Sequence, residues 1–131
     1  MNPTNDPSLT SWVKSAQGSD FPIQNLPWGI FSTEGDERRR AGVRIGDRVL
    51  DVDALQEAGL LDAALPRRIF ATGTLDAFIG LGRPIWSSTR ARLSELLREE
   101  VAILRDDPVL RTRALVPVEA ATMHLAVSVG G

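Results

Sequence analysis

The sequence predicts a mainly β domain of the β-rich α+β class, and length, composition and element order support this. The chain has 131 residues, which suits one domain built around one hydrophobic core. Hydrophobic residues make up 43% and charged residues 24%, the balance of an ordinary globular protein rather than a disordered one. The expected elements run from strands through short helices and one longer amphipathic helix back to strands, which is typical of a small α+β unit.

The first 24 residues are expected to form an irregular arm. Residues 1–24 hold three of the eight prolines, separated by Asn, Ser, Asp and Gly residues that favour turns. One helical turn is expected over residues 11–16, capped by Ser11 or Thr10. The folded domain is therefore expected over residues 25–131.

Three strands are expected to open this domain. Residues 28–33 are rich in aromatic and branched side chains, whereas residues 34–40 are charged apart from one glycine and predict a hairpin loop. Residues 41–45 and 48–52 flank a Gly-Asp pair, which predicts a tight turn with a positive φ angle at Gly46. Such an antiparallel meander is stable only when one of its faces is covered.

Two short helices are expected to supply part of that cover. Asp53 is expected to cap a helix over residues 54–58, which ends at Gly59. A second short helix is expected over residues 74–79, and Gly80 ends it.

A longer amphipathic helix is expected from Pro84 to Leu104. Its stripe, which is expected to face the core, comprises Leu93, Leu96, Leu97, either Glu100 or Val101, and Leu104. Residues 106–108 predict a turn, and residues 113–118 and 121–127 predict two closing extended segments.

The composition excludes several kinds of chemistry. The absence of cysteine excludes disulfides, thiol nucleophiles and sites ligated by cysteine. His124 is the only histidine, so a metal site with several histidines is excluded within this chain.

Charge and hydropathy indicate neither a nucleic-acid partner nor a membrane. The net charge is −2, and acidic and basic residues alternate along the chain without a basic patch. The longest segment without a charged residue, 21–33, contains two prolines and is too short to span a membrane. The first residues lack the basic and apolar regions of a secretory signal, so we expect a cytoplasmic protein.

The acidic candidates for a site have simpler structural explanations. Asp51 and Asp53 are two residues apart at the end of a strand, so both carboxylates are expected on one face. A helix cap at Asp53 and a solvated position for Asp51 are favoured over catalysis. Asp106 and Asp107 precede a proline, where aspartate is typical of a turn.

The remaining candidates are also expected to be structural. The glycines of segment 80–83 lack the spacing of a phosphate-binding loop. The arginines of segment 38–40 follow acidic residues, which predicts local neutralisation on an exposed loop. His124 has no acidic neighbour closer than Glu119, so a half-buried structural histidine is favoured over a general base.

Several segments together resemble the N-terminal part of the fumarylacetoacetases. The most specific is Asp-Phe-Pro-Ile-Gln-Asn-Leu-Pro over residues 20–27. The others, in the same order as in that family, are 11–13, 28–31, 44–51, 54–55, 58–61 and 121–125. The resemblance runs from about Ser11 to Leu125.

The resemblance implies an SH3-like barrel that precedes a larger catalytic domain. It also implies that the whole enzyme hydrolyses a carbon–carbon bond of 4-fumarylacetoacetate, giving fumarate and acetoacetate in tyrosine and phenylalanine degradation, with a calcium or magnesium ion. Family members continue beyond the segment at 121–125, with a proline where this chain has Ala126, into the motif that holds the metal ligands and the histidine base. We therefore expect the catalytic domain to be absent, and we assign no catalytic, metal-binding or cofactor-binding residue to this chain.

Three functions follow as hypotheses from the sequence. The first is the N-terminal domain of a fumarylacetoacetase, inactive alone, which supports the catalytic domain in a homodimer. The second is a stand-alone SH3-like module that binds a protein or peptide. The third is a minimal enzyme that uses His124 with Asp51 or Asp53.

Overall fold

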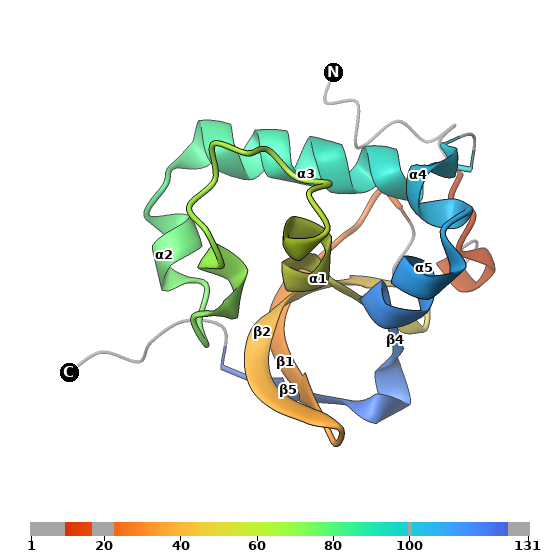
Figure 1. Ribbon diagram of the computed structural model, residues 1–131, viewed down its shortest axis with the longest axis horizontal. Coiled ribbons are helices and arrows are strands. Elements are labelled where there is room, and N and C mark those ends of the chain that lie inside the picture. Colours follow the sequence, from red (N-terminus) through yellow and green to blue (C-terminus); the bar gives the residue numbers. More distant parts are fainter. Residues whose placement is uncertain (1–9, 17–22, 100, 126–131) are drawn as a thin grey trace.

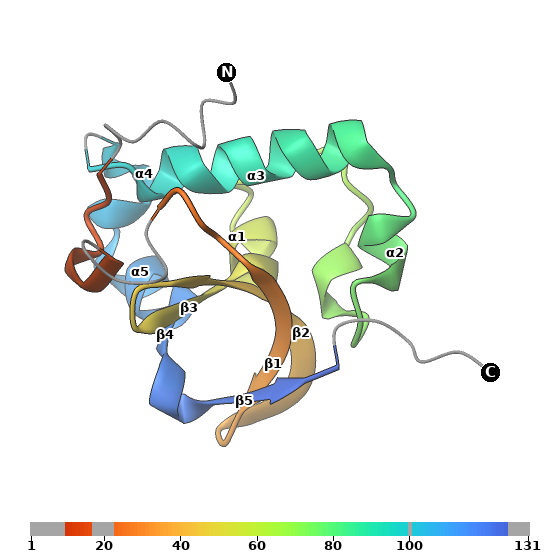
Figure 2. The same ribbon diagram turned by 180° about the vertical axis from the view of Figure 1, so that it is seen from behind.

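A five-stranded antiparallel sheet forms the centre of the computed structural model, which describes residues 10–16, 23–99 and 101–125. The strands are β1 (Trp28–Thr33), β2 (Asp36–Ile45), β3 (Arg48–Asp51), β4 (Leu115–Pro117) and β5 (Ala121–His124). Their order in the sheet is β4-β3-β2-β1-β5. Figures 1 and 2 show that the sheet is strongly curled and that α1, α2 and α3 lie outside the curl.

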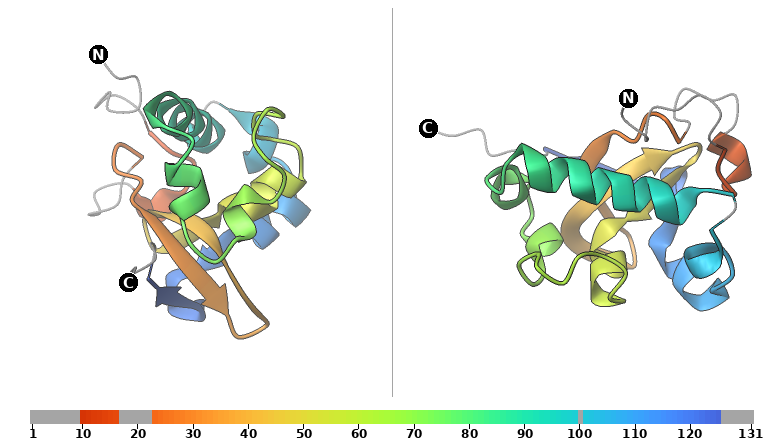
Figure 3. Two further views of the ribbon diagram at one scale, coloured as in Figure 1. Left: turned by 90° about the vertical axis from the view of Figure 1, so that its left-hand side faces the viewer. Right: turned by 90° about the horizontal axis from the view of Figure 1, so that it is seen from above.

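The helices cover the outer face of this sheet. They are α1 (Val52–Glu57), α2 (Asp76–Ile79), α3 (Arg83–Leu97), α4 (Ala102–Arg105) and α5 (Pro108–Ala114). Three 3-10 turns lie at Lys14–Ala16 (η2), Ile69–Ala71 (η3) and Val118–Ala120 (η4). Figure 3 shows α3, the longest helix, end-on and along its length above the sheet. The β-rich α+β class predicted from the sequence is confirmed.

The two faces of the sheet carry different cores. Ile30, Ala41 and Leu50 point to the helices and belong to the main apolar cluster. Phe31 and Val49 are buried on the opposite face, inside the curl. Alternating side chains of a strand point to opposite faces, which explains how both sides of such short strands become buried.

The first strand and the second hairpin are confirmed. Strand β1 covers the residues that were predicted, and the β2–β3 turn has Gly46 at φ +56°. The Ser15 backbone lies so close to Gly46 that any side chain there would clash. The short helix α2 is confirmed as well, since it ends at Gly80.

The predicted hairpin loop at 34–40 is wrong, because β2 begins already at Asp36. Only Glu34 and Gly35 form the turn. The charged run pairs as a strand because Arg40 points into the curl and binds Asp51, so its charge does not require solvent.

The predicted long helix to Leu104 is also wrong, because α3 ends at Leu97 and Arg98 has an extended backbone with ψ 143°. The N-terminal segment causes this end: Ser11 forms a β-bridge with Arg98, and the Trp12 amide donates to the Leu97 carbonyl at 3.3 Å. Leu104 is still buried, but on the separate helix α4.

Two features of the predicted caps and closing segments need correction. Residues 108–114 form helix α5, whose N-cap is Asp107. Of the extended segment predicted at 113–118, residues 113–114 are therefore helical, and residues 115–117 are confirmed as β4. The N-cap of α1 is Asp51, which accepts from the Ala54 amide at 3.0 Å, and not Asp53. Of the predicted closing segment, residues 121–124 are confirmed as β5, and residues 126–127 lie outside the described residues.

The N-terminal segment packs into the main core. Trp12, Val13 and Ala16 are buried there, and the Trp12 indole N–H donates to the Leu96 carbonyl at 2.9 Å. The predicted helical turn is the 3-10 turn η2, and residues 1–9 of the predicted arm lie outside the described residues.

Candidate functional site

Asp51 lies inside the curl of the sheet, where an arginine neutralises it. Its carboxylate accepts from the Arg40 Nε at 2.9 Å and from the Ala54 amide. Burial raises the pKa of Asp51, although these two hydrogen bonds oppose the shift. Both hydrogen bonds stabilise the fold. The bond from Arg40 neutralises the buried carboxylate, and the bond from the Ala54 amide caps helix α1.

Asp53 is buried beside Asp51 but has a different partner. The guanidinium of Arg68 donates to its carboxylate at 3.1 and 3.2 Å. Arg68 has a left-handed backbone with φ +58°, and it also binds Glu57 at 3.3 Å. The solvated position predicted for Asp51 is wrong, because this side chain is buried and paired with Arg40. Both aspartates nevertheless have structural partners, through ion pairs that the sequence did not reveal.

The three arginines at 38–40 have separate environments. Arg38 forms a local ion pair with Asp36 at 2.7 Å, and this hydrogen bond holds the pKa of Asp36 well below its usual range. Arg40 is buried, with its guanidinium 4.5 Å from the centre of the Phe31 ring. Only Arg39 of the run points to solvent without an ion pair among the described residues. Local neutralisation applies to Arg38, whereas Arg40 belongs to the interior.

His124 is half-buried near the end of β5, as expected. Its Nε2 lies 2.7 Å from the hydroxyl oxygen of the buried Ser32. Strands β1 and β2 lie between it and Asp51 in the sheet, so neither aspartate reaches this ring. The arrangement proposed for a minimal enzyme is therefore not present. In the described part of the chain, no group of three or more His, Asp or Glu side chains is placed to hold a metal ion.

The other polar candidates have structural roles. Asp107 accepts from the Leu110 amide at 3.1 Å and caps α5, while Asp106 binds Arg105. Gly80 ends α2 and Gly82 precedes α3, so their segment joins two helices.

An apolar groove lies between β1, α2 and α3. It has a volume of about 480 Å³ and is lined by Trp28, Leu75, Phe78, Ile79, Trp86, Ser87 and Arg90. The Trp28 and Phe78 rings lie 5.0 Å apart, and the Trp86 indole donates to the Phe78 carbonyl at 3.0 Å, which fixes the walls. This groove could not be predicted from the sequence, because its walls come from three separate segments.

The end of β5 exposes apolar side chains near this groove. Met123 and Leu125 are 55% and 72% exposed. His124 pairs with Ile30 in antiparallel register, and a Cβ atom at Gly29, the residue next to Trp28, would lie 2.7 Å from the Met123 side chain. The end of β5 therefore lies beside β1, the strand that carries Trp28 of the groove.

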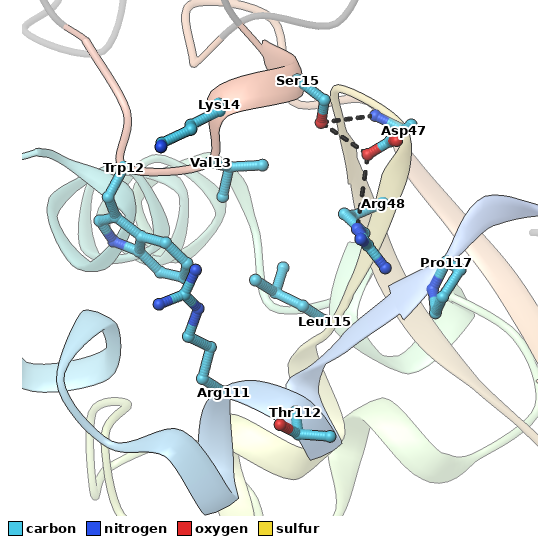
Figure 4. A pocket seen from close by; sticks show the side chains of 10 residues that line it. All are labelled: Trp12, Val13, Lys14, Ser15, Asp47, Arg48, Arg111, Thr112, Leu115 and Pro117. Atoms are coloured by element: carbon cyan, nitrogen blue, oxygen red, sulfur yellow. Dashed lines mark hydrogen bonds and ion pairs between the residues drawn. The ribbon is translucent and has the colours of Figure 1, made fainter.

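A second hollow, of about 550 Å³, lies between the N-terminal segment, the β2–β3 turn and helix α5 (Figure 4). It is lined by the charged residues Lys14, Arg48, Arg111 and Asp47 and by the apolar residues Val13 and Leu115, among others. Sequence reasoning missed it, because its residues lie up to about a hundred positions apart.

None of the described helices is both long enough and apolar enough to cross a membrane.

Comparison with known proteins gives a consistent result. The family model described as fumarylacetoacetase N-terminal matches residues 24–126. A fumarylacetoacetase of Caenorhabditis elegans is 46% identical over 125 residues, which cover 93% of this chain and 29% of the relative. Those of Homo sapiens and of Oryza sativa are 43% and 42% identical, with coverage of 92–93% of this chain and 29–30% of the relatives. The chain thus spans less than a third of the relatives' length.

Proposed function

Because this chain belongs to the fumarylacetoacetase N-terminal family, we propose that it is the non-catalytic N-terminal domain of a fumarylacetoacetase. The match over residues 24–126 carries this proposal. The geometry supports it, since Asp51, Asp53 and His124 are each held by a structural partner.

The complete enzyme, in this proposal, hydrolyses a carbon–carbon bond of 4-fumarylacetoacetate in the cytoplasm, as a step of tyrosine and phenylalanine degradation. The calcium or magnesium ion implied by the family does not fit the described residues. Such ions need several oxygen ligands, whereas the buried carboxylates here are bound to Arg40 and Arg68. The proposal therefore places the metal and the water-activating residues in a separate catalytic domain.

The proposed role of this domain is to support that catalytic domain through the apolar surface formed by the groove and the end of β5. An exposed apolar surface of this kind is typical of an interface. The position of β5 supports the same surface, because its register places His124 opposite Ile30, two residues from Trp28 of the groove.

An activity assay tests the catalytic part of the proposal. The chain is incubated with 4-fumarylacetoacetate and either calcium or magnesium, and loss of substrate is followed by absorbance. We expect no turnover above the rate without protein. Turnover that depends on the metal ion would contradict the proposal.

A binding assay tests the supporting role. The ligand is the C-terminal remainder of the C. elegans relative, and the readout is calorimetry with this chain. Ile79→Lys places a charge in the groove wall and is expected to abolish binding. Ile103→Lys is the matched control, because Ile103 is a similarly exposed isoleucine on α4, away from the groove. Equal affinity of both variants would exclude the groove as the docking site.

The stand-alone binding module remains the second candidate, and the aromatic groove favours it. Grooves lined by tryptophan and phenylalanine are typical of peptide sites. Selection from a random peptide library on this chain distinguishes the two. The second proposal replaces the first if two results are found together. Selected peptides must lose binding in Ile79→Lys but not in Ile103→Lys, and this chain must not bind the C-terminal remainder of the enzyme.

The proposal includes self-association of the isolated chain. Strand β5 is an edge of the sheet, and edge strands with apolar residues tend to pair with another copy. We expect light scattering after size exclusion to show a dimer at high concentration, and Met123→Lys to weaken it. A monomer at all concentrations would contradict this.

A further inference from the structure

The hollow of Figure 4 carries an excess of positive charge. Lys14, Arg48 and Arg111 line it, against one carboxylate, Asp47. The Ser15 hydroxyl donates to Asp47 at 2.6 Å and lowers the pKa of that carboxyl, so the carboxylate is ionised at neutral pH. Three cations against one anion leave a net charge of +2 in a protein whose total charge is −2.

The cations of the hollow are not neutralised by the described residues. The Lys14 ammonium has no hydrogen bond or ion pair within the described ranges, and Arg48 has only the contact to Asp47 at 3.4 Å. The Arg111 guanidinium lies over the Trp12 ring, 4.8 Å from the ring centre. Its one hydrogen bond within the described residues, to the Arg105 carbonyl, is long at 3.4 Å. Cationic donors that line a hollow with so few acceptors favour an anion.

The space between these cations has apolar walls. Figure 4 shows Val13 above it, Leu115 below it, Arg48 on one side and the Trp12–Arg111 stack on the other. A bare, strongly hydrated ion gains nothing from such walls, whereas a flat apolar body does.

We propose that this hollow binds a small organic anion in which a carboxylate is attached to a flat apolar body. The planar guanidinium of Arg111 suits a carboxylate, because its parallel N–H groups bind both oxygens. Lys14 and Arg48 add attraction from two further sides, and the body of the ligand covers Val13 and Leu115. This inference does not depend on the proposed function, since the hollow lies apart from the groove and the end of β5.

Lys14 makes the test specific, because it is the only lysine of the chain. Reductive methylation with carbon-13 labels its amine and keeps the charge. The N-terminal amine is also labelled, and its signal is distinguished from that of Lys14 because it is unchanged in Lys14→Gln, in which it is the remaining labelled amine. The probe is sodium benzoate at constant ionic strength, and the indole N–H signal of Trp12 is the second reporter.

We expect benzoate to shift both signals saturably, with a Kd of about 1–10 mM, as suits a ligand of this size. Arg111→Gln is expected to weaken binding about tenfold, while Arg39→Gln, which removes the same charge from β2, leaves it within about twofold. Lys14→Gln, read through Trp12, is expected to weaken binding several-fold. The amide spectrum of each variant verifies its fold.

Two further probes separate the contributions. Neutral benzamide has the same body without the charge, and inorganic phosphate has the charge without the body, so both are expected to bind at least about tenfold more weakly. A benzoate shift that does not saturate, or that is equal in Arg111→Gln and Arg39→Gln, would overturn the site. Phosphate binding as tight as that of benzoate would overturn the organic carboxylate as its ligand.

Discussion

At the residue scale, the ion pair between Arg40 and Asp51 is the most consequential polar contact of the fold. Both side chains are buried inside the curled sheet next to Phe31. Such a pair stabilises the fold little more than two apolar side chains in its place would. Loss of one partner is costly, however, because it leaves an unpaired buried charge. The pair therefore fixes which residues face the inside of the curl.

Arg40→Ala is expected to lower the free energy of unfolding by about 3–5 kcal/mol at pH 7. The loss is expected to shrink as the pH falls. In the variant, burial without the guanidinium raises the pKa of Asp51 further above its unfolded value of about 3.9. The folded variant then binds a proton more tightly than the unfolded chain does, so its stability increases as the pH falls through the raised pKa. Urea unfolding at pH 7 and pH 5 measures this, with Arg39→Ala as an exposed control. A loss that is the same at both pH values would contradict the unpaired charge.

Gly42 is a second residue on which the inside of the curl depends. A Cβ atom at this position would lie 2.7 Å from the Val49 side chain and 2.8 Å from the Phe31 ring. Gly42→Ala is therefore expected to cost about 1–3 kcal/mol or more, because these neighbours are packed and cannot move apart freely. Gly35→Ala, in the same hairpin but with open space around its Cβ position, is expected to change stability by less than about 0.5 kcal/mol. Equal effects in thermal unfolding would refute the close approach.

Sequence reasoning at this scale recognised which residues are structural but not their partners. The aspartates at 51 and 53 were expected to be structural, yet Asp51 is the helix cap and Asp53 the ion-pair partner. The partner of Asp51 lies eleven positions away on the neighbouring strand. Which residues face each other across two strands depends on the register between them. The partner of Asp51 was missed because β2 is longer than predicted and includes Arg40.

At the element scale, local signals predicted turns well and ends of helices poorly. The Gly-Asp turn and the glycine after α2 were predicted because a single residue decides the backbone there. The end of α3 was missed because Ser11, which lies 87 positions earlier, pairs with Arg98. Helix α5 was missed although Asp107 and Pro108 form an ordinary helix start, because residues 106–108 were interpreted as a turn and residues 113–118 as an extended segment.

The cap of α5 gives a prediction at this scale. Asp107→Ala removes the carboxylate that accepts from the Leu110 amide and is expected to cost about 1 kcal/mol. Asp106→Ala is a matched control with the same change of charge, because Asp106 binds only Arg105 at the surface, and its loss should cost less than about 0.5 kcal/mol. Denaturant unfolding compares the two, and hydrogen exchange of α5 amides shows whether the loss is local. If Asp106→Ala costs as much as Asp107→Ala, the cap is not the cause.

At the scale of the whole molecule, the class was predictable while the candidate sites were not. The order of strands and helices depends on patterns within short windows, so the α+β class follows from the sequence. The apolar groove and the cationic hollow each join side chains from three or more segments, and no local pattern brings these together. Hydrophobic periodicity predicted the fold class but no family. The specific motif at residues 20–27 indicated the family.

Substitutions in the N-terminal segment test whether the domain unfolds as one cooperative unit. Trp12 is 8% exposed, contacts the main core and binds the end of α3 through its indole N–H. If the segment is part of the same cooperative structure, Trp12→Ala should lower the free energy of unfolding by about 3–5 kcal/mol in a single transition. Trp12→Phe, which keeps most of the ring but loses the hydrogen bond to Leu96, should cost less, and Val109→Ala at an exposed site should cost almost nothing. Urea unfolding followed by circular dichroism measures the global change, and hydrogen exchange locates it. An unchanged midpoint, with faster exchange only at residues 10–16 and 97–99, would mean that the segment opens separately and that the sheet with its helices is stable without it.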